Sequence, residues 1–321
     1  MIRRRPRLGA AVLALTVPLA GCVTVHGERA DIPSVGRAEA ARVLARFAAV
    51  DNAADKAYDP TLIPGIQSGP LGAIDEAGLR AKRANHPDGD PAYRPLVFSD
   101  TRYLIPRQVG WPKFFVADTA VNRGTGARWL LVFRRAAAGR PWRADFLAVP
   151  PGGRIPDLAT DARGYAVAVP AAGTGLLVQP GQVATAYTAY LQQGAGSLFA
   201  DGAQTTRLRT ARAGRARTAN SVTQYADQPA RGGDFDPVAL RTGDGGALVF
   251  FGTRHQSRAT YRADHPLAVD PDVAALMTGT PHTSVTLSNV GQQLVLVPKG
   301  GGTAKVVFLS RIVGLVAARG E

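Results

Sequence analysis

The chain contains little cysteine, little lysine and no long hydrophobic run, and each shortage excludes a class of protein or site. A single cysteine in 321 residues excludes a disulfide scaffold and a zinc cluster built on several cysteines. No Gly-x-Ser-x-Gly or Ser-x-x-Lys sequence occurs, so these motifs of serine nucleophiles are absent. The apolar stretch at residues 8–21 has 14 residues, whereas a transmembrane helix needs about 20.

The composition is otherwise that of a folded protein with excess positive charge. Hydrophobic residues make up 45% of the chain and charged residues 19%. A length of 321 residues is enough for roughly two domains of about 150 residues each. The 38 basic residues, of which 5 are lysine, outnumber the 24 acidic ones and give a formal charge of +14.

Residues 1–21 have the parts of a signal peptide. Four arginines within the first seven residues form a basic start, and the apolar stretch that follows ends in small residues just before Cys22. This ending, Leu19-Ala20-Gly21-Cys22, resembles the lipobox of bacterial lipoproteins, in which the cysteine receives a diacylglycerol and becomes the mature N-terminus. The resemblance implies lipidation of Cys22. Two alternatives stay open: an ordinary secretory signal with an unrelated cysteine, and a twin-arginine signal, which Pro6 disfavours.

Residues 22–36 are predicted to be a lipidated tether, because they are polar, lack a clear period and include Pro33 and Gly36. Two acyl chains hold a protein stably on a membrane, whereas one holds it only marginally. The bias towards Arg, Ala and Gly is similar to that of actinobacterial, Streptomyces-type lipoproteins of an uncharacterised family. The resemblance implies a protein anchored through Cys22 to the outer face of the cytoplasmic membrane.

The rest of the chain predicts two similar modules, at residues 37–169 and 176–321, joined by a stretch rich in Gly, Ala and Pro. In each module, apolar residues first recur at helical spacing. Further along, they alternate with polar residues or form short apolar runs, as in strands. In the first module, helices are expected near residues 40–50 and 71–79, followed by strands; these are 96–98, 103–105, 113–118, 129–135 and 142–149. Residues 136–141 are expected to form a hairpin loop.

In the second module a helix is expected near residues 183–191, followed by four strands; these are 247–253, 285–287, 294–297 and 305–316. The runs at 129–133 and 306–309 are apolar on both sides of the pleat, which predicts central strands. Helices followed by antiparallel strands indicate an α+β fold, with a helix packed on a curved antiparallel sheet in each module.

The segment from Leu62 to Asp75 contains a short apolar run, then Ser68-Gly69-Pro70, then a helix that carries Asp75. This phrase resembles one in uncharacterised actinobacterial lipoproteins that are treated as NTF2-like or cystatin-like, with one sheet wrapped over helices. The resemblance covers about the first 150 residues. It implies a concave pocket and no particular activity, because such folds serve both enzymes and binding modules.

Candidate chemical groups are few. The glycine-rich Lys299–Thr303 is predicted to be a hairpin turn, since its lysine precedes the glycines. Histidines and aspartates that could bind a metal lack helical ligand spacing, and a turn is the favoured interpretation; these are His86, Asp88, Asp90, His255, Asp264, His265 and His282. Three aspartates lie in or beside predicted strands, where burial would raise the pKa of an inward-facing one; these are Asp100, Asp118 and Asp145.

An arginine-rich segment without acidic residues lies in the second module; its arginines are Arg207, Arg209, Arg212, Arg215 and Arg217. It has two interpretations: a patch for anionic partners such as lipid headgroups or phosphate-bearing wall polymers, and a solvated loop or strand. The alternation around Leu208 favours the second.

We therefore expect a lipid-anchored envelope protein that binds a ligand or partner and is not an enzyme. Two alternatives stay open: an envelope hydrolase or isomerase using an Asp or His in a cone-shaped pocket, and a structural scaffold whose sheet edges pair with partner strands. Beyond lipidation of Cys22 we assign no catalytic, cofactor or metal-binding residue and expect no cofactor. The expected partners are the membrane and a small molecule, an anionic envelope polymer or a protein; nucleic acid is not expected.

Overall fold

The computed structural model describes residues 30–194, 196–263 and 267–321. The elements of its first half are β1 (Ile32–Pro33), α1 (Arg37–Ala57), the 3-10 helix η2 (Pro60–Gly65), α2 (Gly69–Asn85), β2 (Phe98–Leu104), β3 (Arg107–Gln108), β4 (Lys113–Val121), β5 (Arg128–Arg135), β6 (Arg143–Ala148) and η3 (Pro151–Gly153). Those of the second half are α3 (Pro180–Gln193), α4 (Thr206–Arg215), β7 (Ser221–Ala230), η4 (Gly233–Phe235), β8 (Val238–Arg241), β9 (Ala247–Tyr261), α5 (Pro271–Ala275), β10 (Met277–Thr278), β11 (Ser284–Val297) and β12 (Val307–Gly320).

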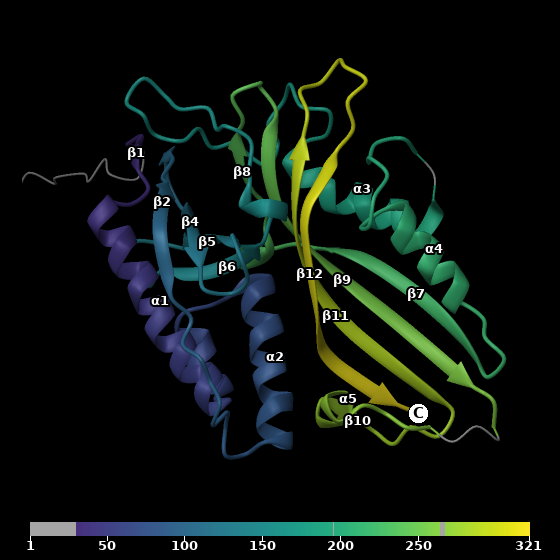
Figure 1. The fold of residues 1–321 in the computed structure, drawn as a ribbon. Coiled ribbons are helices and arrows are strands. Elements are labelled where there is room, and N and C mark those ends of the chain that lie inside the picture. Colours follow the sequence, from purple (N-terminus) through teal and green to yellow (C-terminus); the bar gives the residue numbers. More distant parts are fainter. Residues whose placement is uncertain (1–29, 195, 264–266) are drawn as a thin grey trace, which may run out of the picture.

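Two open sheets form the centre of the molecule (Figure 1). The first has the order β2-β4-β5-β6 and is antiparallel throughout. The second has the order β10-β12-β11-β9-β7, with β8 beside β9, and is antiparallel except for the short β10, which pairs parallel to β12. Helices with antiparallel sheets confirm the α+β class. The division into modules at residues 37–169 and 176–321 stays a prediction, because the halves share much of their packing.

Where the two sheets pack on each other, both faces are buried, and strands β4 and β5 and the first half of β9 are apolar on both sides of the pleat. In the first sheet, Phe115 and Phe133 face α1, their rings stacked with centroids 5.0 Å apart. Val116 and Val132 point the other way, into a core shared with Leu248 and Phe250 of the second sheet. The opposite face of the second sheet packs against α3. The layers therefore run α1, first sheet, second sheet, α3.

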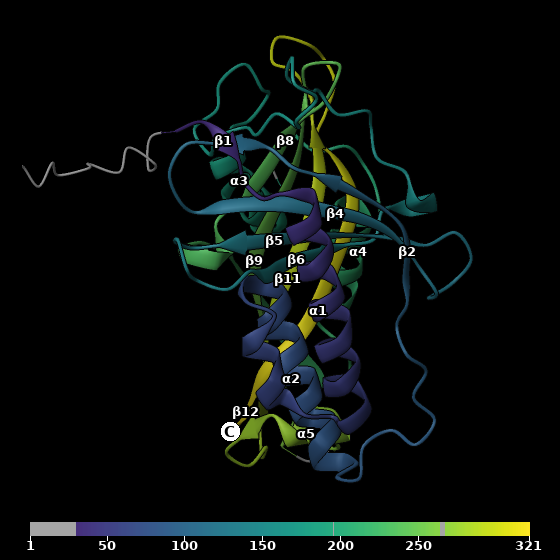
Figure 2. The ribbon, with the colours of Figure 1, turned by 90° about the vertical axis from the view of Figure 1, so that its left-hand side faces the viewer.

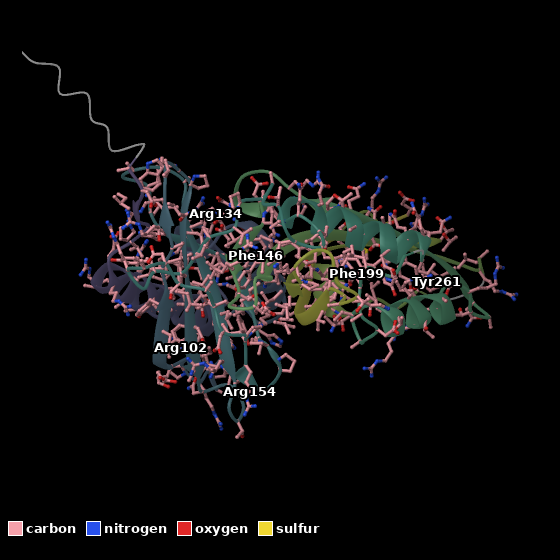
Figure 3. The ribbon with its side chains drawn as sticks, turned by 90° about the horizontal axis from the view of Figure 1, so that it is seen from above. Arg102, Arg134, Phe146, Arg154, Phe199 and Tyr261 are labelled. Atoms are coloured by element: carbon pink, nitrogen blue, oxygen red, sulfur yellow. The ribbon has the colours of Figure 1, made fainter. Side chains whose placement is uncertain are left out.

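The views from the side and from above show how the halves meet. In Figure 2 the strands of the first sheet cross those of the second, with α1 and α2 side by side below them. In Figure 3 Arg134 and Phe146 lie where the halves join, whereas Phe199 lies within the second half. The rings of Phe146 and Phe250 have centroids 6.3 Å apart across this junction.

Helix α2 belongs to the first half in sequence but also packs on the second sheet. Pro70 contacts the sheet at Gly252 of β9, and Ile74 lies directly over Gly314 of β12, so a side chain at Gly314 would meet Ile74. At the other end of the helix, Asn85 Nδ2 donates to Asp272 Oδ1 at 2.7 Å. One helix thus ties the two sheets together.

The outer edge of β6 is also covered by the second sheet. The Leu147 amide donates to Gln292 Oε1 at 2.7 Å, and the Val149 amide donates to Ser310 Oγ at 3.0 Å. These side chains explain a difference from the sequence prediction. Residues 285–287 and 294–297 belong to one strand, β11, because the polar residues between them make buried hydrogen bonds rather than a turn.

Three further predictions need correction. The arginine-rich segment is neither loop nor strand in its main part: residues 206–215 form α4, consistent with the helix propensity of its Ala and Arg residues. Strands β7 and β8 were not predicted. Residues 306–309 do not lie in a central strand, since β12 has β11 on one side and only the two-residue β10 on the other. Phe308 is nonetheless packed, with its ring 4.6 Å from that of Tyr187.

The other helices, strands β4, β5 and β6 and the hairpin between β5 and β6 agree with the sequence prediction. The two strands predicted at residues 96–98 and 103–105 are instead one strand, β2, with an irregular pairing between Ser99 and Arg102. Among the described residues, none of the helices is both long and apolar enough to cross a bilayer.

Candidate functional site

A cavity of about 300 Å³ opens between α1, α2 and the ends of strands β5 and β6. We call it the acidic pocket, because three of its charged side chains are aspartates. Its lining consists of Phe47, Asp51, Asp55, Leu71, Ile74, Asp75, Gly78, Leu79, Lys82, Trp129 and Leu147. Carboxylates at an apolar, aromatic cavity are a common arrangement in small-molecule sites.

Helical spacing places the first two aspartates. Phe47, Asp51 and Asp55 are four residues apart on α1, so they lie on one face of the helix. Phe47 anchors this face in the core of the first sheet. Asp75 enters the same cavity from α2. The three carboxylates therefore come from two packed helices, whose backbones hold them in place.

The segment before α2 contributes a buried hydrogen bond. Gln67 is 1% exposed, and its Nε2 donates to Asp51 Oδ1 at 3.0 Å. Directly after Asp51 on α1, Asn52 fixes the loop that follows α2: Asn52 Oδ1 accepts from the Leu96 amide at 2.6 Å and from the Tyr93 hydroxyl at 2.5 Å. The loop, α1 and the segment before α2 are thereby held around the pocket.

The three carboxylates hold protons more tightly than ordinary aspartates. Burial, and then repulsion from Asp55 and Asp75, raises the pKa of Asp51 to about 7. Burial, with repulsion from Asp55, raises the pKa of Asp75 to about 6. Burial also raises the pKa of Asp55, against the attraction of Lys82. The pocket therefore has negative charge that no residue of its lining fully balances, and it exchanges protons near neutral pH.

The walls of the acidic pocket add aromatic rings to the carboxylates. Phe47 forms part of one wall and Trp129 of another. Indole and phenyl faces attract cations, and carboxylates do so more strongly. The arrangement can therefore bind a positively charged organic group, and its partly protonated carboxyl groups can also give and take protons.

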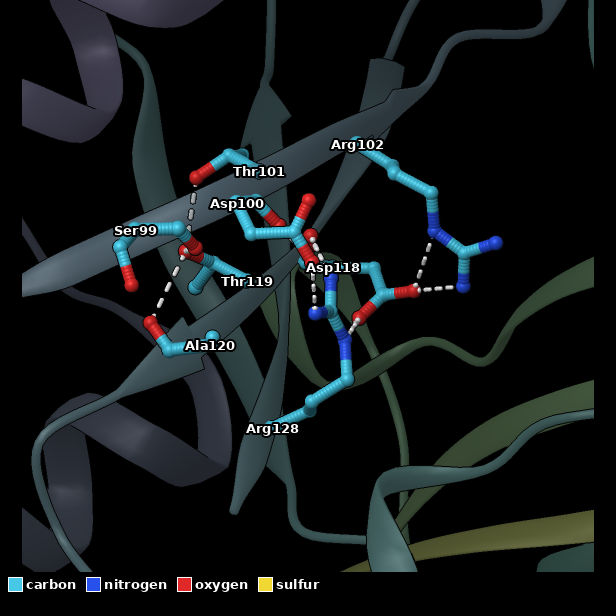
Figure 4. A network of polar contacts seen from close by, with 8 residues as sticks. All are labelled: Ser99, Asp100, Thr101, Arg102, Asp118, Thr119, Ala120 and Arg128. Atoms are coloured by element: carbon cyan, nitrogen blue, oxygen red, sulfur yellow. Dashed lines mark hydrogen bonds and ion pairs between the residues drawn. The ribbon is translucent and has the colours of Figure 1, made fainter. Parts of the chain in front are cut away.

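Asp118, one of the predicted candidates, has no oxygen free for chemistry (Figure 4). It is buried on β4, where Arg128 Nε donates to its Oδ1 at 2.7 Å and Arg102 contacts its Oδ2. Arg128 also bridges to Asp100, which is exposed and has φ of 43° at the irregular pairing between β2 and β4. This network joins strand ends and is structural.

Asp145, another predicted candidate, lies at the junction of the halves. Burial raises its pKa to about 7 against the attraction of Arg134, whose Nε lies 2.5 Å from its Oδ2. Ser68 Oγ donates to its other oxygen at 2.6 Å. Arg134 in turn donates to the carbonyl oxygens of Gly233 and Asp236. The raised pKa predicted for an inward-facing aspartate is present, but both oxygens of Asp145 have protein partners.

The histidines and aspartates considered as metal ligands do not converge. His86, Asp88 and Asp90 form the expected turn, in which the Ala92 amide donates to Asp90 Oδ1 at 2.9 Å. His255 is buried in the second sheet, far along the chain from the exposed His282. Asp264 and His265 lie outside the described residues. Among the residues that are described, no three His, Cys, Asp or Glu side chains form a metal-binding group.

The arginines of α4 divide into two sets. Arg212 makes two hydrogen bonds to Asp227, at 2.7 and 3.0 Å, and Arg209 lies over the Tyr190 ring and donates to the Gly194 carbonyl oxygen. Arg207, Arg215 and Arg217 are exposed. The segment thus partly serves to attach α4.

Sequence reasoning identified Asp75 on a helix but missed Asp51 and Asp55. A signal was present: both follow Phe47 at intervals of four, so a helix with Phe47 in the core must also turn Asp51 inwards. Their meeting with Asp75 depends on how α1 and α2 pack, and no local pattern specifies that.

Comparison with protein families identifies the chain. Residues 32–320 match the model of the domain of unknown function DUF8094. The chain belongs to this family. The DUF8094 match covers both halves, including every carboxylate of the acidic pocket.

Two Streptomyces relatives resemble the chain over nearly its whole length. It is 44% identical to the uncharacterized lipoprotein SCO2278 of Streptomyces coelicolor, across 99% of this chain and 98% of the relative. It is 43% identical to an uncharacterized lipoprotein of Streptomyces avermitilis, across 97% and 94% of the two chains. The resemblance to Streptomyces-type lipoproteins is thereby confirmed. No solved structure matches this DUF8094 chain. Cys22 lies outside the described residues.

Proposed function

We propose that the protein is anchored to the outer face of the cytoplasmic membrane by lipid on Cys22 and binds a small organic cation in the acidic pocket. The anchor is supported by the lipobox-like sequence at Cys22 and by the lipoprotein names of the two Streptomyces relatives. The binding function rests on one observation: three aspartates with raised pKa values line a cavity that also has aromatic walls.

Burial is the main cause of these raised pKa values, with repulsion between carboxylates second, and a bound cation would favour the ionised carboxylates against both. Asp51, Asp55 and Asp75 bring three potential negative charges, against one positive charge from Lys82. A bound amine would supply the missing charge, and its carbon atoms would contact Phe47 and Trp129. A cavity of about 300 Å³ fits a small molecule. An organic cation is favoured over a metal ion because the described residues form no metal-binding group.

The sheet-and-helix layout around the pocket supports an NTF2-like or cystatin-like interpretation of the first half. Helix α1 crosses one face of a four-stranded antiparallel sheet whose long strands follow one another in sequence. The acidic pocket lies between that sheet and the helices, where a cone-shaped fold would have its cavity.

Binding is best tested by proton release. The chain from residue 23, without lipid, retains every described residue; it is titrated by calorimetry with primary, secondary and quaternary amines. We expect binding to strengthen as pH rises from about 5.5 to 8, because the carboxyl groups must ionise. The heat should vary with the ionisation enthalpy of the buffer, because binding releases protons. Binding that is independent of pH and buffer would contradict the proposal.

Two variants assign the binding to the pocket. Asp51→Asn should weaken amine binding at least about tenfold, since a close charge pair in a desolvated site is worth 1.5–3 kcal/mol or more. Asp88→Asn removes the same charge from an exposed turn of the same half and should leave binding unchanged. Trp129 in a Trp111→Phe, Trp142→Phe background provides a fluorescence signal from the pocket wall.

Acid–base catalysis is the second candidate, favoured by the unequal pKa values of Asp51 and Asp75, about 7 and about 6. Between these values one carboxyl group can donate a proton and the other accept one. The same titration mixtures, followed by NMR, test this: new product signals that vanish in Asp75→Asn would indicate an enzyme. A scaffold that pairs through its edges has less support, because β7 contains Pro229 and residues 216–218 cover its start.

A further inference from the structure

A second cavity, of about 360 Å³, lies beside the first half of α1. We call it the arginine pocket. Its charged lining residues are Glu39, Arg42, Arg46 and Arg135, and Phe47, Phe133 and Trp142 contribute aromatic walls. At 3.6 residues per turn, Arg42 and Arg46 lie on the side of α1 opposite to Asp51 and Asp55. The two pockets are therefore separate sites on either flank of one helix.

One carboxylate fixes two of the walls. Glu39 Oε1 accepts a hydrogen bond from Trp142 Nε1 at 3.0 Å and pairs with Arg135. The guanidinium carbon of Arg135 lies 4.6 Å from the centre of the Trp142 ring. Arg135 Nε is buried and has no hydrogen-bond partner. Arg135 and Trp142 are thus held in position, with one donor of the guanidinium unsatisfied.

The two arginines from α1 leave most of their donors available. Arg46 Nη2 donates to the Gly65 carbonyl oxygen at 3.2 Å, and Arg42 makes no ion pair within the described part of the chain. Both are exposed. Three guanidinium groups converge on the cavity against a single carboxylate that is already paired. The pocket carries an uncompensated positive charge.

We propose that the arginine pocket binds a phosphate ester. Guanidinium groups match the planar pairs of oxygens on phosphate, and several around one cavity favour a group with more than two acceptor oxygens. The aromatic walls beside them would contact the carbon substituent of the ester. The arginine pocket is positively charged and its proposed ligand negatively charged, whereas the acidic pocket is negatively charged and its proposed amine positively charged. Phosphate binding would therefore be a second activity, separate from amine binding.

The source of the phosphate ester can be a lipid headgroup or a soluble ester, and the position of the pocket bears on this. Helix α1 begins beside β1, next to the point where the described chain starts at residue 30 (Figure 1). Eight residues from Cys22 to that point extend at most about 29 Å. Only the choice between these two sources rests on the proposed lipid anchor. If Cys22 is lipidated, the arginine pocket lies within reach of phospholipid headgroups.

The test uses the chain from residue 23 without lipid, in co-sedimentation with vesicles and in solution with glycerol 3-phosphate. Vesicles contain either phosphatidylcholine alone or a mixture with phosphatidylglycerol. The substitutions Trp111→Phe and Trp129→Phe leave Trp142 as the only tryptophan. Its fluorescence then reports binding at the wall of the arginine pocket. A Trp142 response to glycerol 3-phosphate supports a soluble ester. A response to phosphatidylglycerol vesicles that glycerol 3-phosphate does not displace supports a lipid headgroup.

Charge-matched variants separate the pocket from general attraction. Arg42→Ala with Arg46→Ala should weaken binding of the phosphate ester at least about tenfold, because two charge-assisted contacts are lost. Arg207→Ala with Arg215→Ala removes the same charge from α4, at the far end of the molecule (Figure 1), and should weaken it less than about threefold. All four side chains are exposed, so the variants should fold.

Three results would overturn the inference: equal losses in the two double variants, no loss in either, or no response of Trp142 to any phosphate ester. Its failure is distinct from failure of the proposed amine binding. Asp51→Asn should leave phosphate binding intact, and the Arg42 and Arg46 variant should leave amine binding intact.

Discussion

Asp51 in the first half of the molecule and Asp227 in the second are both buried beside a helix that covers a sheet, but their surroundings shift their pKa values in opposite directions. In the first half, Asp51 lies between the sheet and α1, and its pKa is raised by burial and by two other carboxylates. In the second half, Asp227 of β7 is also buried beside the helices that cover its sheet. Burial would raise its pKa, but hydrogen bonds from His255 and Arg212 hold it below the ordinary value.

Asp227 therefore belongs to a network of paired side chains, whereas Asp51 lines the acidic pocket. Asp227 Oδ1 lies 2.5 Å from His255 Nδ1, and His255 Nε2 lies 2.7 Å from Thr253 Oγ1. Hydroxyl, imidazole and carboxylate are in the order of a hydrolase triad, but Thr253 is fully buried, and Gln293 Nε2 also donates to its hydroxyl. The charge of Asp227 is matched by Arg212 within the fold, whereas the charge of Asp51 has, among the described residues, only the neutral amide of Gln67 beside it as a hydrogen-bond partner.

Because their pKa values are shifted in opposite directions, Asp51 and Asp227 make stability depend on pH in opposite ways. Asp51 has a folded pKa above its unfolded value, so its contribution to stability is complete below about pH 4 and is lost as pH rises to about 7. Asp227 has a folded pKa below its unfolded value, so its contribution is present above about pH 4 and is lost as pH falls. The pKa of His255 is lowered, by burial first, so its contribution is lost as pH falls below about 6.5.

The largest effect is expected from breaking the network of the second half. Asp227→Ala leaves Arg212 and His255 without their partner and should lower the free energy of unfolding by about 3–5 kcal/mol. Urea unfolding at pH 7.5 measures this. Arg215→Ala, on the exposed side of α4, is the control and should change it by less than about 0.5 kcal/mol. A small loss for Asp227→Ala would mean that the network does little for stability.

Removing the charge of Asp51 in the first half should instead raise the free energy of unfolding. Asp51→Asn removes a charge that burial penalises and keeps an oxygen for Gln67, so the protein should become more stable at pH 8, by up to about 4 kcal/mol. The difference between variant and parent should shrink to nothing near pH 4. Asp88→Asn should match the parent throughout. Destabilisation by Asp51→Asn at pH 8 would show that the Asp51 carboxylate has a positively charged partner there, besides Gln67.

Helix α2 joins the halves, and a double-mutant cycle sharpens the comparison at that joint. Gly314→Ala would place a methyl group against Ile74 and should cost about 1–3 kcal/mol. In an Ile74→Ala background the same substitution should cost much less, because the obstruction is gone. Gly302→Ala, in an exposed turn with open space, is the control. Additive costs would mean that α2 and β12 do not contact each other in solution.

The smallest effect is expected at Lys82, the cation in the lining of the acidic pocket. Its attraction opposes the raised pKa values of Asp55 and Asp75. Lys82→Met should therefore raise the midpoint of the Trp129 fluorescence titration, by less than about one pH unit because Lys82 is exposed. A downward shift would contradict the assigned direction.

The helices and strands whose apolar residues recur at regular spacing could be predicted from the sequence. Much less of the candidate site could be predicted. Helices α1, α2 and α3 and the first sheet follow from apolar spacing. Strand β7 was missed because its polar residues outnumber its apolar ones, and the apolar ones do not alternate along it. Segment 206–215 was misjudged because its charge suggested solvent, whereas Arg212 turns inwards to Asp227.

The acidic pocket depends on two facts that a single segment does not encode. Phe47 and its spacing to Asp51 indicate a polar residue on a buried face. That Asp75 approaches from another helix, and Trp129 from a strand, follows only from the packed fold. The covering of the outer strand β6 also could not be predicted from a local pattern. Its edge is covered by Gln292 and Ser310, which are more than 140 residues away in sequence.

The contact between Ile74 and Gly314 also affects the order in which the chain can fold. Synthesis begins at the N-terminus, so α2 is made long before β12, since 240 residues separate the two contact points. Until the last strand emerges, α2 and the shared face of the first sheet have no partner surface. The first half therefore completes its core late, and the growing chain exposes apolar surface that favours aggregation until β12 is made.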